Sequence, residues 1–270
     1  MPDTPAQDEV ERQDERRVFS WLATHTLGGV THKISGALAL LSAEPPGQPL
    51  TPDQRALVGI ARDSTAQLMQ LSEDIQLLTH AAAQTLELHP QRIPLTTLLR
   101  QSTEQAQSPT PTNPLRDIQT HIPAAMPPVW CDSALTRRAL AAIVENALRF
   151  TPRDSQVCID AHKRGEWAII TVRDYGDGVP TCEADAIFEP LYSGRRRRVN
   201  VGVGLGVGLG LAVARVSIEA QGGEIALAPV DGPGASFVVK LPLTPPRRAA
   251  SDGSAATRHD DDPASGVVRR

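Results

Sequence analysis

Apolar residues recur every three or four positions in two stretches of the N-terminal third of the chain. The first stretch starts near Val18, and its stripe consists of Leu27, Val30, Ile34, Ala37 and Leu41. The second stripe consists of Leu57, Ile60, Ser64, Leu68, Leu71, Ile75 and Leu78, in a run that continues to about Leu88. This spacing predicts two amphipathic helices. The proline-containing segment 44–49 separates them, and His89 and Pro90 close the second, so we predict a helical hairpin over residues 18–89.

A two-helix hairpin buries too little apolar surface to be stable alone. Two copies that pair into a four-helix bundle would bury both stripes. We therefore predict that the protein is a homodimer.

The pattern changes after Pro90. Helical periodicity returns near 96–107 and 133–150, with a proline-rich connector up to Pro128 between them. Alternation and β-branched residues then predict strands at 157–161, 167–173, 223–228 and 236–241. The fold class is thus α+β, with a polar segment (1–17), the hairpin (18–89), a second domain (90–243) and a tail (244–270). The tail has little aliphatic bulk, which predicts disorder.

Composition narrows the function classes. Aromatic residues make up only 3% of the chain and its net charge is −4. Base-stacking platforms and a basic footprint are therefore missing, which argues against nucleic-acid binding. The one dense basic cluster before the tail is 195–198, and a solvated loop explains it as well as a phosphate contact does.

The cysteines and the hydropathy pattern bear on the compartment. Cys131, Cys158 and Cys182 lie more than twenty residues apart and are odd in number, which argues against paired metal ligands and a disulfide framework. No apolar stretch approaches the ~18 residues of a membrane span, and the charged N-terminus is unlike a signal peptide. We expect a cytoplasmic protein without a membrane span.

Three short segments, in this order, indicate a nucleotide site. Asn146 lies in a predicted helix, where its amide can complete the coordination of a phosphate-bound Mg²⁺. Asp174 can accept a hydrogen bond from an exocyclic amine, while Gly176 and Gly178 allow a tight turn close to a flat ring. The third segment has bare backbone N–H groups for phosphates at a helix start. Its glycines nearest that helix are Gly206, Gly208 and Gly210.

Two other nucleotide motifs are excluded by spacing. In 201–210 no register satisfies GxGxxG, because Val207, Leu209 or Leu211 occupies the sixth position. The sequence also has no GK[ST]. A dinucleotide fold and a P-loop are therefore disfavoured.

These residues resemble the histidine protein kinases of bacterial two-component systems, within the wider Bergerat-fold ATPases that include gyrase and MutL. ENALRFTP resembles the family's N box, DYGDGVP its G1 box, IFEPLYSG its F box and GVGLGLAVAR its G2 box, in the family's order. The resemblance covers roughly residues 18–243. It implies an α/β sandwich that holds ATP, with Mg²⁺ on Asn146, phosphate near Arg149, the adenine amine on Asp174 and a mobile lid over 189–206.

The phosphoacceptor is one of two histidines in the first helix. Periodicity leaves His25 and His32 both outside the apolar stripe, where each is otherwise an ordinary surface histidine. The resemblance favours His32, because Ile34 and Leu38 match the apolar residues that follow the family's histidine.

Three positions depart from the family pattern. Lys33 replaces the acid that usually accepts the imidazole proton. This predicts slow autophosphorylation, because the loss of a general base lowers a rate by about 10² to 10⁴. Gly36 lacks the side chain used to dephosphorylate the partner. Ala142 stands where the N box often has a second Asn, which predicts weaker phosphate or metal support.

The resemblance therefore predicts an ATP-dependent protein histidine kinase that uses Mg²⁺, autophosphorylates on His32 and passes the phosphoryl group to an aspartate of a response-regulator receiver domain. The alternative is a nucleotide-binding phosphorelay or scaffold protein with weak or lost autokinase activity. A serine kinase of the anti-sigma type shares the ATP fold but needs no histidine-bearing hairpin. Only about seventeen residues precede the first helix, so we expect input from elsewhere, such as a separate sensor protein.

Overall fold

The computed structural model describes residues 28–42, 49–107, 117–152, 154–192 and 208–245. Several predictions concern residues outside these ranges: the first ten residues of the N-terminal helix with His25, the arginine cluster 195–198, Gly206, the N-terminal segment and the tail beyond 245. In the described part, no helix is long and apolar enough to cross a membrane.

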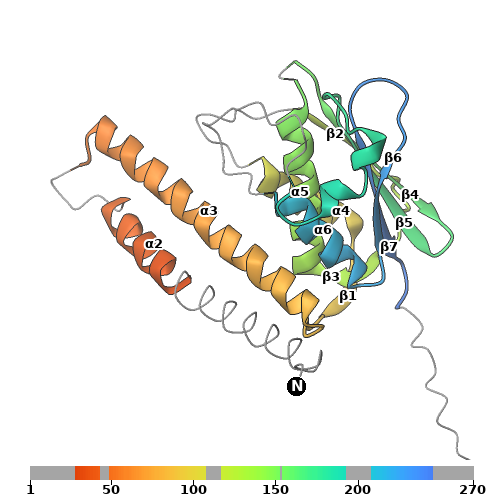
Figure 1. Cartoon of the computed structure of the whole chain (residues 1–270), viewed down its shortest axis with the longest axis horizontal. Helices are drawn as coiled ribbons and strands as arrows, with labels where there is room; N and C mark the ends of the chain where they lie inside the picture. Colours follow the sequence, from red (N-terminus) through yellow and green to blue (C-terminus); the bar gives the residue numbers. More distant parts are fainter. Residues whose placement is uncertain (1–27, 43–48, 108–116, 153, 193–207, 246–270) are drawn as a thin grey trace, which may run out of the picture.

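The N-terminal region is a helical hairpin of α2 (Gly28–Ser42) and α3 (Pro52–Ala82) (Figure 1). A capping box starts α3: the Thr51 hydroxyl accepts the Gln54 N–H, and the Gln54 side chain accepts the Thr51 N–H. The helix ends about six residues before the Leu88 predicted from periodicity. Gln84 adopts a left-handed conformation with φ 55°, and this turns the chain out of the helix before the apolar pattern stops.

The apolar stripes of the hairpin are largely exposed in the single chain. Leu57 is 66% exposed and Ile60 64%, and Ile34 on α2 is also exposed. The buried positions of α3 are instead polar, and they are Thr65, Ser72 and Asp74. The hairpin therefore has an apolar face that the chain itself does not cover.

The C-terminal region is built on a five-stranded sheet in the order β2-β4-β5-β7-β6. Its strands are β2 (Ile118–His121), β4 (Val157–Arg164), β5 (Trp167–Arg173), β6 (Glu224–Ala228) and β7 (Ser236–Pro242). The β2–β4 pair is parallel and the others are antiparallel. A separate antiparallel pair joins β1 (Pro90–Ile93) to β3 (Val129–Asp132). Sequence periodicity missed β1, β2 and β3, because four-residue strands are too short to show alternation.

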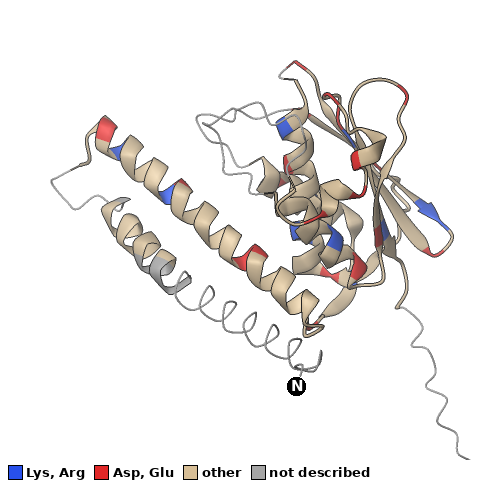
Figure 2. Ribbon diagram, in the orientation of Figure 1, with Lys and Arg blue, Asp and Glu red and all other residues tan. Residues whose placement is uncertain are grey.

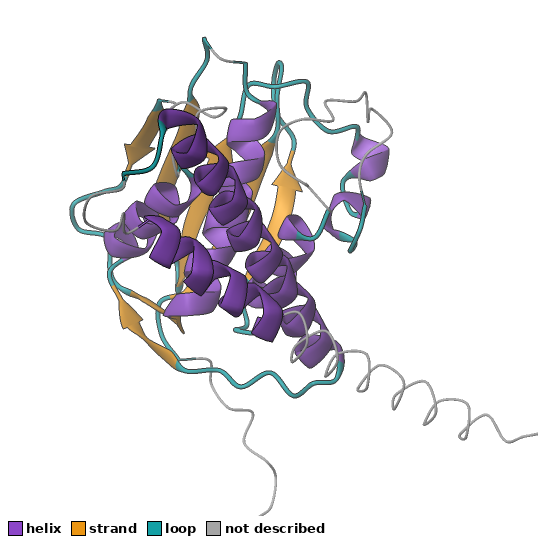
Figure 3. Cartoon of the chain, turned by 90° about the vertical axis from the view of Figure 1, so that its left-hand side faces the viewer, coloured by secondary structure: helices purple, strands orange, loops and turns teal. Residues whose placement is uncertain are grey.

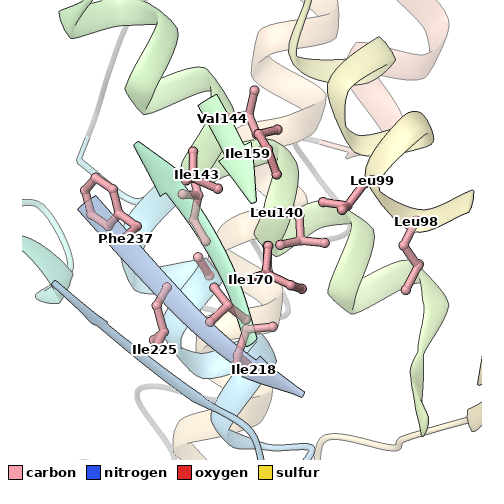
Figure 4. Close-up of a cluster of buried hydrophobic side chains, with 14 of the residues drawn as sticks. Leu98, Leu99, Leu140, Ile143, Val144, Ile159, Ile170, Ile218, Ile225 and Phe237 are labelled. Atoms are coloured by element: carbon pink, nitrogen blue, oxygen red, sulfur yellow. The ribbon is translucent and has the colours of Figure 1, made fainter. Parts of the chain in front are cut away.

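Helices α4 (Leu95–Ala106), α5 (Ser133–Phe150) and α6 (Gly210–Glu219) cover one face of this sheet (Figure 3). Two short 3-10 helices, η2 (Thr181–Glu183) and η3 (Ala186–Phe188), follow β5. The core lies between the two layers, where Leu140 and Ile143 of α5 meet Ile159 and Ile170 of the sheet (Figure 4). All four side chains are fully buried. The predicted α/β sandwich after a helical hairpin is confirmed.

A buried ion pair joins the two regions. The Arg138 guanidinium on α5 donates to both carboxylate oxygens of Asp74 on α3, at 2.8 Å to Oδ2 and 3.0 and 3.2 Å to Oδ1. Only 15% of the Arg138 side chain and 9% of the Asp74 side chain are exposed. Figure 2 shows acidic positions in the C-terminal half of α3 beside basic positions of the helix layer. The hairpin is thus held to the sheet region through α3, which also packs against α6.

Candidate nucleotide-binding site

Helix α5 brings the three predicted segments together. Ala142, Asn146 and Phe150 lie one turn apart along it, a rise of about 6 Å each. A Cβ built on Gly210, the first residue of α6, would lie 3.6 Å from the Ala142 Cβ. A Cβ built on Gly176 would lie 3.2 Å from the Phe150 Cβ. The start of α6 and the loop after β5 therefore flank Asn146, one turn to each side.

Asp174 follows β5 and is only 2% exposed. Its Oδ1 accepts the N–H of Gly176 and the N–H of Ala235, both at 3.0 Å. No hydrogen bond to Oδ2 occurs among the described residues. Burial raises the pKa of the Asp174 carboxyl, and the two N–H donors and then the Arg173 charge partly offset this. The carboxylate is held through one oxygen and keeps the other as an acceptor.

The two glycines after Asp174 are required by close backbone contacts. A Cβ at Gly176 would overlap the carbonyl oxygen of Phe150. Gly178 has φ 74°, and its Cβ would lie 2.8 Å from the carbonyl oxygen of Gly234. The sequence predicted that these two glycines allow a tight turn close to a flat ring. The structure adds that each glycine also lets the loop pack onto another part of the protein.

The start of α6 is suited to bind an anion. The first backbone N–H groups of a helix have no intrahelical partner. In α6 the N-cap residue is Leu209, and it makes no side-chain hydrogen bond to them. Gly208 has φ 77°, and its carbonyl accepts the N–H of Leu191 at 3.0 Å. This bond links the F box directly to the G2 box. Free N–H groups at a helix start are a ready phosphate site.

The polar side chains of α5 complete the site. The half-buried Asn146 amide makes no hydrogen bond within the described part of the chain, and Arg149 is exposed in the last turn. Glu145 is exposed, yet desolvation by the surrounding protein raises the pKa of its carboxyl; the Arg138 and Arg149 charges oppose this shift and Asp74 adds to it. Ala142 is buried against Gly210, so a second Asn at this position would crowd the start of α6.

His32 and Lys33 lie on α2, and the structure describes their backbone only. Helix α2 packs against α3, which packs against α6. Helix α3 therefore lies between the helix of His32 and the candidate nucleotide-binding residues (Figure 1). The fold gathers the motif residues of the sheet region but does not bring His32 to them.

Comparison with known proteins identifies the sheet region. Residues 131–245 match the model of the histidine kinase-, DNA gyrase B- and HSP90-like ATPases. This region is therefore similar to that ATPase family. The resemblance of the chain to two-component sensor kinases is also confirmed by curated relatives. This chain is 34% identical to the adaptive-response sensory kinase SasA of Prochlorococcus marinus strain MIT 9303, over 47% of its own length and 34% of that protein.

A second relative is the alginate biosynthesis sensor protein KinB of Pseudomonas aeruginosa, 27% identical over 47% of this chain and 20% of KinB. The chain thus spans between a fifth and about a third of the length of these relatives. Full-length ShkA in complex with AMPPNP has a similar fold, with a TM-score of 0.63 and 24% identity over 85% of this chain and 45% of ShkA. The Acinetobacter baumannii histidine kinase AdeS has a TM-score of 0.52 and 19% identity, over 79% of this chain and 95% of AdeS.

Sequence reasoning missed Ala235, whose N–H holds the Asp174 carboxylate. It predicted the strands at 223–228 and 236–241 and gave no role to the connection between them. The available signal was the pair Gly232 and Gly234 around a proline, immediately before a strand. Two glycines in a short connection indicate positive φ angles or close contacts.

Proposed function

We propose that the protein is an ATP-dependent protein histidine kinase, which autophosphorylates on His32 and passes the phosphoryl group to an aspartate of a response-regulator receiver domain. The observation that carries this proposal is the convergence along α5 of Asn146, the Asp174 loop and the uncapped start of α6. This convergence lies in a region matched to histidine kinase-like ATPases.

The donor set fits ATP with Mg²⁺. The free Oδ2 of Asp174 would accept the adenine amine, with Gly176 and Gly178 beside the base. The glycine-containing start of α6, from Gly208 to Gly210, would direct N–H groups at the phosphates, and Arg149 would add positive charge. Asn146 would hold Mg²⁺, which neutralises phosphate charge when bound.

The transfer itself requires a neutral imidazole. A ring nitrogen of His32 attacks the γ-phosphorus, the N–P bond forms and the P–O bond to ADP breaks. The proton on the other ring nitrogen must then leave. Lys33 cannot accept it as a cation, although its charge favours the neutral imidazole. We therefore expect the rate of autophosphorylation to be lower by about 10² to 10⁴ than at a site with a general base.

The domain boundaries and the partners are part of this proposal. Residues 18–89 form the dimerisation and phosphotransfer hairpin, and residues 90–243 form the ATP-binding domain. A second copy would cover the exposed apolar face of α2 and α3. The three free cysteines, Cys131, Cys158 and Cys182, fit a reducing compartment, which favours the cytoplasm.

Labelled ATP tests the proposal. We expect the wild-type chain to gain label that is stable to alkali and labile to acid, as a phosphohistidine is. His32→Gln should remove this label, and the matched variant His25→Gln should retain it. Full labelling of His32→Gln would contradict the assignment of the phosphoacceptor. ATP binding without any label would favour the phosphorelay or scaffold alternative.

A further inference from the structure

We propose that the end of the turn between β6 and β7, Gly234 and Ala235, forms a wall of the nucleotide site, and that Gly234 is a positioning residue that orients Asp174 for adenine rather than guanine. The inference rests on the proposed ATP site. It concerns a segment that lies outside the N, G1, F and G2 boxes.

Two hydrogen bonds link Asp174 to Ala235 at the end of the turn, and each residue donates one of them. The Asp174 N–H donates to the Ala235 carbonyl at 2.9 Å, and the Ala235 N–H donates to Asp174 Oδ1 at 3.0 Å. The β5–β7 ladder ends at the preceding pair, Arg173 and Ser236. In a regular antiparallel ladder a backbone carbonyl would receive the second N–H. Here the carboxylate takes this role, so the position of the turn sets the orientation of the side chain.

Gly234 allows this arrangement because it has no side chain. Its φ is 95°, and a Cβ at this position would overlap the Asp174 carbonyl oxygen and lie 2.8 Å from the Tyr175 Cα. From the other side, the Gly234 carbonyl oxygen occupies the space that a Cβ on Gly178 would need. The Asp174 loop and the β6–β7 turn therefore fit together through a glycine on each side.

This fit fixes which oxygen faces the nucleotide base. Oδ1 receives two N–H donors, from Gly176 and Ala235, so rotation of the carboxylate would break both bonds. Oδ2 remains as an acceptor in a site that is almost fully buried. Adenine offers an amine donor at its six-position, whereas guanine offers a carbonyl oxygen there. A fixed carboxylate oxygen attracts the first and repels the second.

Gly232 provides a matched control in the same turn. Its φ is 98°, but a Cβ there would meet no atom within 4 Å. Alanine at either position therefore carries the strain of a positive φ, while only Gly234→Ala pushes against Asp174. We expect Gly232→Ala to bind ATP like the wild type. Gly234→Ala should lose ATP affinity about tenfold or more, the loss expected for a disturbed hydrogen bond to a charged group, and its preference for ATP over GTP should fall.

Dissociation constants for ATP and GTP, measured on the full chain together with the thermal midpoint, decide the inference. Equal ATP affinity and equal ATP-to-GTP ratios in the two variants would overturn it. A wild-type chain that binds no ATP would instead contradict the proposed function.

Asp174→Asn decides the question where Gly234→Ala does not fold. The Asn oxygen would keep the two backbone N–H groups, and its NH₂ group would replace Oδ2 as a donor facing the base. We expect the ATP-to-GTP affinity ratio to fall at least tenfold. An unchanged ratio would mean that the carboxylate is not held in this orientation.

Discussion

The hairpin and the sheet region bury their apolar residues very differently. In the sheet region, Leu140 and Ile170 are completely buried between helices and strands. On the hairpin, Leu57 and Ile60 have comparable side chains and are about two-thirds exposed. A helix layer and a sheet enclose a core within one chain, whereas two helices in contact leave their outer faces open. The comparison teaches that the sheet region is complete in itself and the hairpin is not.

The junction between the two regions is centred on charged and polar side chains rather than on apolar ones. Its central contact is the ion pair of Asp74 and Arg138, supported by a hydrogen bond from Gln70 to the same carboxylate at 3.1 Å. Such a buried pair depends on geometry, because each charge has lost its water. The junction is therefore specific, and it is vulnerable to the loss of either charge.

The largest difference between the two regions should appear in the free energy of unfolding when an apolar side chain is truncated. Leu140→Ala removes a fully buried side chain and should lower the free energy of unfolding by about 2–5 kcal/mol. Leu57→Ala, the matched change on the hairpin, should change the stability of the single chain by less than about 0.5 kcal/mol. Denaturant titration of both variants measures this. Equal losses would show that the hairpin has a core of its own.

The junction should respond to loss of one charge. Asp74→Asn removes the carboxylate charge to which the buried Arg138 bonds directly and should destabilise the chain by about 1–3 kcal/mol. Asp63→Asn is the control, because Asp63 pairs with Arg62 at 4.0 Å on the surface of the same helix. Exposed pairs of this kind contribute about 0–1 kcal/mol. A chemical-denaturation series that ranks Asp63→Asn as the more damaging change would contradict this view of the junction.

The nucleotide site should titrate through Asp174. The pKa of Asp174 is raised in the folded state, so its protonated form is favoured there. The stability linked to this proton is present below the unfolded pKa and is lost as pH rises through the folded pKa. ATP needs the ionised acceptor, so its affinity should fall about tenfold per pH unit below the folded pKa.

Nucleotide affinity and thermal midpoint, followed from about pH 4 to pH 7, measure these opposite trends. The acidic limb of ATP binding should lie above the pH at which an ordinary aspartate titrates. Asp174→Asn should remove the acid-linked gain in midpoint. Persistence of that gain in the Asn variant would assign it to another group.

The capping box at the start of α3 should contribute about 1 kcal/mol to the free energy of unfolding. Thr51→Ala removes the hydroxyl that accepts the Gln54 N–H, whereas Thr51→Ser keeps it. Circular dichroism during thermal unfolding should therefore show a lower midpoint for the Ala variant alone. If the Ser variant loses as much, the threonine methyl group and not the cap is responsible.

The smallest effect on the single chain concerns the open apolar face. Leu57→Ser should hardly change the unfolding of a monomer but should weaken the proposed dimer, because the side chain would be buried only between two copies. Sedimentation at several concentrations measures the dimer dissociation constant. An exposed polar position, Gln67→Ser, provides the control. Identical dissociation constants for wild type and Leu57→Ser would place the dimer contact elsewhere.

The sequence by itself determined the long helices and the longer strands, and it supplied the candidate residues of the proposed nucleotide site. Periods of 3.6 and 2 are local properties of the chain, and the chemistry of Asn146, Asp174 and the glycines is carried by short segments. The end of α3 was misplaced because the apolar pattern continues past the left-handed Gln84. The strands β1 to β3 were missed because they are short.

Only the tertiary structure decided how distant residues meet. Asp174 is held by Ala235 and Asp74 by Arg138, 61 and 64 positions away. The exposure of the hairpin stripes and the separation of His32 from the proposed ATP site likewise depend on the packing of α3 against α2 and α6. No local period encodes such contacts, because they depend on the close packing of backbones and side chains that the whole fold brings together.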